Sequence, residues 1–158
     1  MNTNKNSYIF IYASVMVIIV AFLLAFVSSA LKPIQQKNVE LDKKKQVLAA
    51  LNIFEKDAEA AYNTYVKADQ LLKADGTVAA ENGGFAVENA AVSADNLPLY
   101  VCEVEGATKY VLPLYGAGLW GPIWGYVALN ADKEPIYGVY FSHAGETPGL
   151  GAEITNRD

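Results

Sequence analysis

The N-terminal stretch constrains the fold more than any other part of the chain. Asn6–Leu31 contains 26 residues without a charged side chain, and Ile9–Val27 is apolar except for Ser14. At a rise of about 1.5 Å per residue, a helix over Ile9–Val27 spans roughly 28 Å, close to the hydrocarbon thickness of a bilayer. The sequence therefore predicts a short N-terminal tail over residues 1–7 and a transmembrane helix over residues 8–31.

A cleaved signal peptide is the alternative interpretation of this stretch. Ser28-Ser29-Ala30 offers the small residues of a cleavage site. The apolar region of a signal peptide, however, normally has only about 7–15 residues. The length of the apolar run favours a retained membrane anchor.

The charges that flank the predicted span bear on its orientation. Lys5 is the only charge before the span, whereas Lys32, Lys37 and Lys43–Lys45 follow it. The positive-inside rule, applied to these charges alone, predicts that the bulk of the protein lies in the cytoplasm.

The overall composition excludes several classes of function. The 158-residue chain has a formal net charge of −5, so no basic surface is available for nucleic acid. A single cysteine, Cys102, rules out an internal disulfide framework and a CxxC pair. Cys102 lies in an alternating apolar run, which indicates a buried strand thiol. The sequence also lacks a dinucleotide-type glycine fingerprint, a phosphate loop and metal-ligand spacing.

The segment after the span has a helical pattern. We expect Pro33 to end the span region and an amphipathic linker helix region to occupy residues 32–75. The pattern continues towards Leu71–Leu72 as a second helix or helical turn, until Asp75-Gly76 and Asn82-Gly83-Gly84 break it. The apolar residues that recur at helical spacing are Val47, Leu48, Leu51, Phe54 and Ala58, followed by Tyr62, Tyr65 and Val66.

After Gly84 the pattern changes to that of β-structure, within a sheet domain expected over residues 76–158. Leu99–Val104 and Lys109–Leu114 flank a short turn and predict one hairpin. Ile123–Leu129 and Ile136–Ser142 predict another. With the helices before them, these strands indicate an α+β fold with an antiparallel sheet.

Two glycine-rich stretches are the candidates for a binding site. Tyr115–Gly125 reads YGAGLWGPIWG and holds two tryptophans, which either pack in a core or offer a surface for a flat ring. Ser142–Ile154 reads SHAGETPGLGAEI and is either an ordinary strand-to-helix turn or a loop that presents main-chain N–H groups to a ligand. A planar heteroaromatic ligand could stack on Trp120 and accept hydrogen bonds from the backbone of residues 147–151. That combination suits a flavin-like molecule better than a sugar or a peptide.

These motifs closely resemble a known family. GLWGPIWGYVAL at residues 118–129, IYGVYFSH at 136–143 and ETPGLGAEI at 146–154 are similar to the C subunit of the Na⁺-translocating NADH:quinone reductase, a respiratory complex of bacteria. The N-terminal span and NVELDKKKQVLAALNI at 38–53 resemble the same family, so the likeness covers nearly the whole chain. ETPGLG alone would also fit the G subunit of the related Rnf complex, and the GLWGPIWGYVAL segment favours the C subunit of the reductase.

The resemblance implies a cofactor and its partners. The implied cofactor is FMN, joined through a phosphoester to a threonine in a domain on the periplasmic side of the inner membrane. That flavin relays electrons from NADH toward ubiquinone or menaquinone with sodium export. The implied partners are the other subunits of the six-subunit complex, the lipid bilayer and a flavin transferase.

The resemblance also implies cofactor-binding residues by position. Trp120 would border the isoalloxazine ring, and the loop against it would contain Glu146, Thr147, Gly149 and Leu150. His143, which precedes that loop, is expected to be a structural polar residue more than a proton carrier. We expect no catalytic acid–base residue and no metal ligand.

The flavin-attachment motif of the family should lie well downstream of ETPGLG, beyond Asp158. We therefore expect the covalent FMN threonine to be absent from this chain, which would be truncated, incomplete in its FMN-binding domain and not catalytic alone. Glu105-Gly106-Ala107-Thr108 resembles the motif, but it lies in the wrong place and at a predicted hairpin turn.

Two other functions remain open from the residues alone. One is a membrane-anchored, non-enzymatic module that binds a peptide or a component of the cell envelope. The other is a flavin-binding sensor or flavin-transfer substrate without a role in quinone reduction. Both share the anchor, the small sheet and the aromatic, glycine-rich loops.

Overall fold

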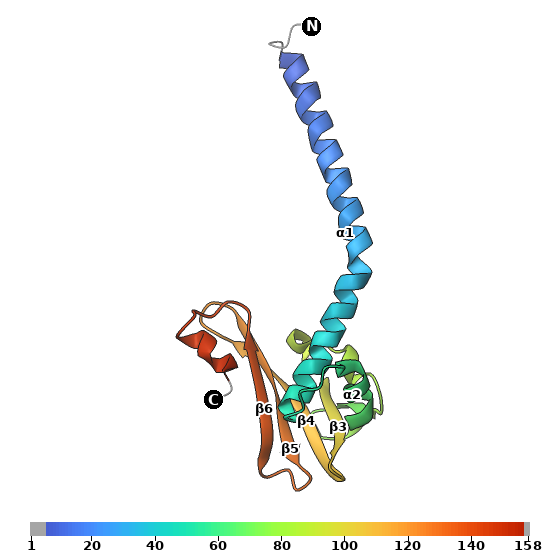
Figure 1. Cartoon of the computed structure of the whole chain (residues 1–158), viewed down its shortest axis with the longest axis vertical. Coiled ribbons are helices and arrows are strands. Elements are labelled where there is room, and N and C mark those ends of the chain that lie inside the picture. Colours follow the sequence, from blue (N-terminus) through green and yellow to red (C-terminus); the bar gives the residue numbers. More distant parts are fainter. Residues whose placement is uncertain (1–5, 157–158) are drawn as a thin grey trace. The chain divides into compact units, whose positions relative to one another are not determined.

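The computed structural model describes residues 6–156 and divides between Glu40 and Leu41 into two compact units (Figure 1). Helices come first along the chain, and strands with short 3₁₀ turns follow. The elements are α1 (Asn6–Ala50), α2 (Ala58–Tyr65), β1 (Val66–Leu72), β2 (Val78–Ala80), the 3₁₀ turns η1 (Gly84–Ala86) and η2 (Asn89–Ala91), β3 (Leu97–Val104), β4 (Ala107–Ala117), β5 (Pro122–Asn130), β6 (Ile136–His143) and η3 (Gly151–Thr155). This is the α+β class that the sequence predicted.

Helix α1 is long and apolar enough to cross a membrane, and its apolar window has no buried residues. The helix runs without a break through Pro33, so the predicted span and the first part of the predicted linker helix form one continuous helix. A proline removes one backbone donor and crowds the preceding turn, at a cost of about 3 kcal/mol. The flanking residues are good helix formers, and the helix continues because only one hydrogen bond is lost.

The C-terminal end of α1 belongs to the second unit and stops at a defined cap. Asn52 adopts a left-handed φ of 59°. The N–H of Asn52 donates to the carbonyl of Ala49 over 3.1 Å, and the N–H of Ile53 donates to the carbonyl of Leu48 over 3.0 Å. These two bonds form the Schellman motif, in which asparagine tolerates the left-handed position.

The second unit is built on one six-stranded antiparallel sheet with the order β2-β1-β3-β4-β5-β6. Both predicted hairpins are present, as β3–β4 and β5–β6. The β3–β4 turn has positive φ at Glu105 and at Gly106. Two consecutive positive φ angles match the right-handed twist of the flanking strands.

Strand β1 corrects the sequence-based expectation for residues 66–72. The helical pattern was extended to Leu71–Leu72, but these residues form a strand that pairs with β3, with Asp69 opposite Tyr100. A short apolar run fits either a helix or a buried strand, so its periodicity does not decide between them. Pairing with a strand from a distant part of the chain decides it instead.

One face of the sheet is covered by the end of α1 and by α2. Leu48 is 2% exposed and packs into a cluster with Tyr100, Val111 and Tyr126 from three strands. Gly138 on β6 leaves room for the carbonyl of Ala50, which a Cβ at that position would strike. The opposite face also carries apolar side chains that remain partly exposed. They include Leu99, Val101, Leu112, Val127 and Phe141.

Buried thiol and phenol groups, among them Cys102 and Tyr126, give the sheet a predictable response to alkaline pH. Burial raises the pKa of the Cys102 thiol from 9.0 to about 12 and, as the largest cause, raises the pKa of the Tyr126 phenol from 10.0 to about 12. Both groups hold their protons more tightly in the folded state than in the unfolded state. Their contribution to the free energy of unfolding is therefore fully present below pH 9 and is lost as the pH rises towards 12. Urea unfolding at stepped pH should show this decline. A free energy of unfolding that stays constant from pH 9 to 12 would contradict it.

Candidate functional site

Two loops meet at one end of the sheet. The first connects β4 to β5 and closes with a 2.8 Å hydrogen bond from the N–H of Gly118 to the carbonyl of Gly121. The second follows β6, where the N–H of Ala144 donates to the carbonyl of Pro122 over 3.0 Å. Figure 1 shows both loops at the same end of the sheet. We call residues 117–122 and 143–151 together the loop pair.

Glu146 links the two loops. Its carboxylate accepts a hydrogen bond from the backbone N–H of Trp120, with 3.1 Å between Oε1 and N. Its own backbone N–H donates to Nδ1 of His143 over 3.1 Å. Nδ1 of His143 is therefore the acceptor at the start of the second loop. The carboxylate therefore bonds to the backbone of the opposite loop.

Glycines make room for this arrangement. A Cβ on Gly118 would collide with Oε1 of Glu146, and a Cβ on Gly151 would lie 2.7 Å from Oε2. Gly149 has a φ of +74°, a backbone conformation that glycine adopts without steric cost. The close approach of the two loops thus depends on glycine at positions 118 and 151 as well as on the Glu146 carboxylate.

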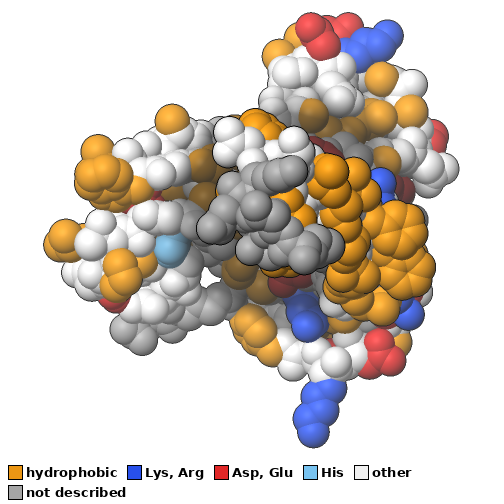
Figure 2. Space-filling model, turned by 90° about the horizontal axis from the view of Figure 1, so that it is seen from above, with side chains coloured by type: hydrophobic (Ala, Val, Ile, Leu, Met, Phe, Trp, Pro, Cys, Tyr) orange, Lys and Arg blue, Asp and Glu red, His pale blue; other side chains and the backbone are white. Residues whose placement is uncertain are grey.

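The loop pair presents large apolar side chains to the solvent. Leu119 is 82% exposed, Trp120 is 69% exposed and Leu150 is 72% exposed. Figure 2 shows hydrophobic side chains that protrude around the single histidine. Leu119 was not among the predicted site residues. The only sequence signal for it is its position between Gly118 and Trp120. Exposed apolar groups that cluster in this way often mark a binding site.

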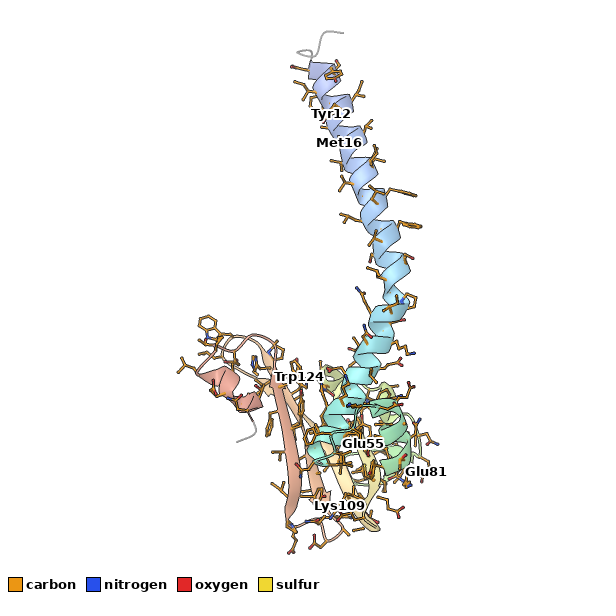
Figure 3. All side chains as sticks on the ribbon, in the orientation of Figure 1. Tyr12, Met16, Glu55, Glu81, Lys109 and Trp124 are labelled. Atoms are coloured by element: carbon orange, nitrogen blue, oxygen red, sulfur yellow. The ribbon has the colours of Figure 1, made fainter. Side chains whose placement is uncertain are left out.

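The two tryptophans have different environments. Trp124 on β5 is half-buried, and its Nε1 donates to Oε1 of Gln46 on α1 over 3.1 Å. Figure 3 shows Trp124 on the sheet beside the C-terminal end of α1. The sequence left open whether the tryptophans pack in the core or offer a surface to a flat ring. Trp124 packs against the protein, and the indole of Trp120 is exposed and available to a ligand.

The second loop also offers backbone donors. The carbonyl of Thr147 accepts from the N–H of Leu150 and from the N–H of Ala152, each over 3.1 Å. The N–H groups of Thr147 and Gly149 have no such partner among the described residues. The site thus combines an exposed indole, an exposed leucine and main-chain donors. This combination suits a flat ligand that carries hydrogen-bond acceptors.

The chemistry of the loop pair is that of a binding site. The Glu146 carboxylate accepts from the backbone N–H of Trp120, and the Glu153 side chain accepts from the amide of Asn156. Within residues 6–156, no group of three or more His, Cys, Asp and Glu side chains could hold a metal ion. The loop pair therefore has the groups to orient a ligand that brings its own reactivity.

A separate cavity of about 300 Å³ lies elsewhere in the second unit. It is lined by residues of α1, the segment after it and β6, including Gln46, Ile53, Phe54 and Tyr140. It has neither tryptophan nor a glycine-rich loop among its lining residues, so it differs in chemistry from the loop pair.

Part of the chain matches the model of a known protein family. Residues 118–157, which contain most of the loop pair, match the model of a family described as an FMN-binding domain. The exposed indole and the backbone donors of the loop pair agree with a flavin site.

Individual proteins that are similar to this chain point to a particular subunit. The C subunit of the Na(+)-translocating NADH-quinone reductase of Pseudomonas aeruginosa is 29% identical over 98% of this chain and 70% of its own length. Its counterpart from Pasteurella multocida is 30% identical over 80% of this chain and 58% of its own length. The crystal structure of the counterpart from Parabacteroides distasonis has 42% identity and a TM-score of 0.75, over 79% of this chain and 64% of that one.

These likenesses agree with the resemblance that the motifs indicated. The chain is similar to C subunits of Na(+)-translocating NADH-quinone reductases over most of its own length. It spans 58–70% of the length of the first three curated relatives that it matches.

Proposed function

We propose that this chain binds FMN at the loop pair and serves as part of a flavoprotein subunit of a Na⁺-translocating NADH:quinone reductase. The observation that carries the proposal is the exposed Trp120 indole in one loop, which the Glu146 carboxylate links to a second loop whose Thr147 and Gly149 N–H groups have no partner among the described residues. Bound FMN would supply the redox chemistry, and the protein would supply position and polarity.

Each predicted cofactor-binding residue has a role that its geometry supports. Trp120 provides an aromatic surface for the isoalloxazine ring, and Leu150 provides an apolar contact from the second loop. Thr147 and Gly149 provide main-chain donors for ring oxygens and nitrogens. Glu146 keeps the two loops together. These five residues remain a proposal for the cofactor site.

The proposed role in a larger complex rests on the resemblance to the C subunits. In this proposal the FMN passes electrons from NADH toward a quinone, and the complex exports sodium. The other subunits of a six-subunit complex would be partners, and a flavin transferase would attach the FMN covalently to a threonine. The family resemblance supports these finer points.

Thr108 is a poor candidate for that covalent attachment. It lies near the β3–β4 turn, whereas the loop pair begins at Ala117, the other end of β4. At about 3.3 Å per strand residue, the two positions are roughly 30 Å apart. Figure 3 shows the neighbouring Lys109 at the end of the sheet that bears this hairpin. We propose that Thr108 is not the attachment threonine.

We also propose that α1 anchors the protein in the inner membrane with residues 84–158 on the periplasmic side. The resemblance to the family favours the periplasmic side, whereas the lysines that follow the span favour the cytoplasm. External protease added to intact spheroplasts should digest residues 84–158. Protection of this region until the membrane is permeabilised would favour the cytoplasmic orientation instead.

The direct test of the cofactor is an FMN titration of the purified full chain in detergent micelles, followed by quenching of FMN fluorescence. We expect saturable binding with one FMN per chain. Saturable binding of a peptide library together with no saturable FMN signal would favour the envelope-binding module and reject the flavin proposal.

A further inference from the structure

The Glu146 carboxylate occupies a space that the rest of the loop pair leaves for it. Oε1 faces the N–H of Trp120 and the open side of Gly118, and Oε2 faces the open side of Gly151. The carboxylate is thus surrounded by a backbone donor and two glycines. In this orientation it turns toward the protein backbone and is engaged before any ligand arrives.

The second connection comes from the backbone of the same residue. The N–H of Glu146 donates to Nδ1 of His143, which is the last residue of β6. Glu146 is therefore held at its backbone by the end of a strand and at its side chain by the neighbouring loop. These two bonds connect the end of β6 to the backbone of Trp120.

We propose that Glu146 is a positioning residue that locks the backbone of Trp120 in place, so that the exposed indole is preorganised for its ligand. This inference rests on the proposed function only for the identity of the ligand. The interaction between Glu146, Trp120 and Gly151 stands on the geometry of the loops. A preorganised aromatic residue binds more tightly because less freedom is lost on binding.

The glycine at position 151 allows a sharp test of this lock. In Gly151→Ala the new Cβ would lie 2.7 Å from Oε2 and 3.2 Å from Cβ of Glu146, and the three nearest atoms all belong to that residue. The carboxylate must therefore move, and its bond to Trp120 weakens. Gly145→Ala is the matched control, because its Cβ would be 3.8 Å from the nearest atom, the carbonyl oxygen of Trp120.

The experiment is amide hydrogen exchange of Trp120 in the ¹⁵N-labelled full chain in micelles, without flavin. Glu146→Ala should lower the protection of the Trp120 N–H by roughly 10-fold, since a hydrogen bond to a charged acceptor is lost. Glu146→Gln should restore most of it, because the amide oxygen can replace Oε1. The urea midpoint of the sheet should stay unchanged in both variants.

The double variant Glu146→Ala/Gly151→Ala tests whether Gly151 affects Trp120 only through the Glu146 carboxylate. Gly151→Ala should reduce Trp120 protection several-fold in the native background and have no further effect in Glu146→Ala. Equal effects in both backgrounds, or no loss of protection in Glu146→Ala, would overturn the inference. FMN affinity is measured in parallel, and it should fall in Glu146→Ala and recover in Glu146→Gln. If exchange behaves as expected and no variant binds FMN, the positioning role stands and the proposed ligand is wrong.

Discussion

Replacing Leu48 with alanine should destabilise the second unit by about 2–5 kcal/mol, the largest stability effect that we expect. Leu48 lies on the last turns of α1, is 2% exposed and packs against the covered face of the sheet. The substitution removes buried methyl groups and leaves a cavity that surrounding side chains fill only in part. Urea unfolding of the full chain in micelles, followed by near-ultraviolet circular dichroism, measures the change.

Leu150→Ala is the matched control for this prediction. It makes the same chemical change at a side chain that is 72% exposed, so its effect on the free energy of unfolding should stay within about 0.5 kcal/mol. Similar losses of stability in both variants would mean that the end of α1 does not pack on the sheet as described.

Replacing Trp120 with alanine should weaken FMN binding by roughly 5- to 150-fold, which corresponds to a lost stacking contact of about 1–3 kcal/mol. The indole is 69% exposed, so its removal should leave the stability of the sheet nearly unchanged. FMN titration of the two proteins under the same conditions measures the ratio of dissociation constants.

Phe54→Ala is the control for this second prediction. Phe54 is an aromatic residue with almost the same exposure, 68%, and it lines the separate cavity. Its replacement should leave FMN affinity unchanged. A larger loss of affinity in Phe54→Ala than in Trp120→Ala would move the cofactor to that cavity.

The hairpins could be predicted from sequence because each consists of neighbouring segments with a turn between them. The β3–β4 turn at Glu105-Gly106 and the alternation on both sides of it are local signals. Strand β1 could not be predicted in this way. Its partner β3 is distant in sequence, and its apolar residues also fit a helix.

The candidate site was predictable in composition but not in geometry. The sequence indicated that Trp120 and the loop from Glu146 to Leu150 belong together, and the structure brings the two loops into contact. The direction of the Glu146 carboxylate depends on the missing side chains of Gly118 and Gly151, which lie in different loops. No spacing rule connects these three residues.

The central claim is that the loop pair is the FMN site, and amide chemical shifts of the ¹⁵N-labelled full chain during an FMN titration test it most directly. The account predicts saturable shifts confined to residues 117–122 and 143–151, with the largest at Trp120, Thr147 and Gly149. Saturable shifts at Ile53, Phe54 and Tyr140, or no saturable shifts in the loop pair, would contradict it.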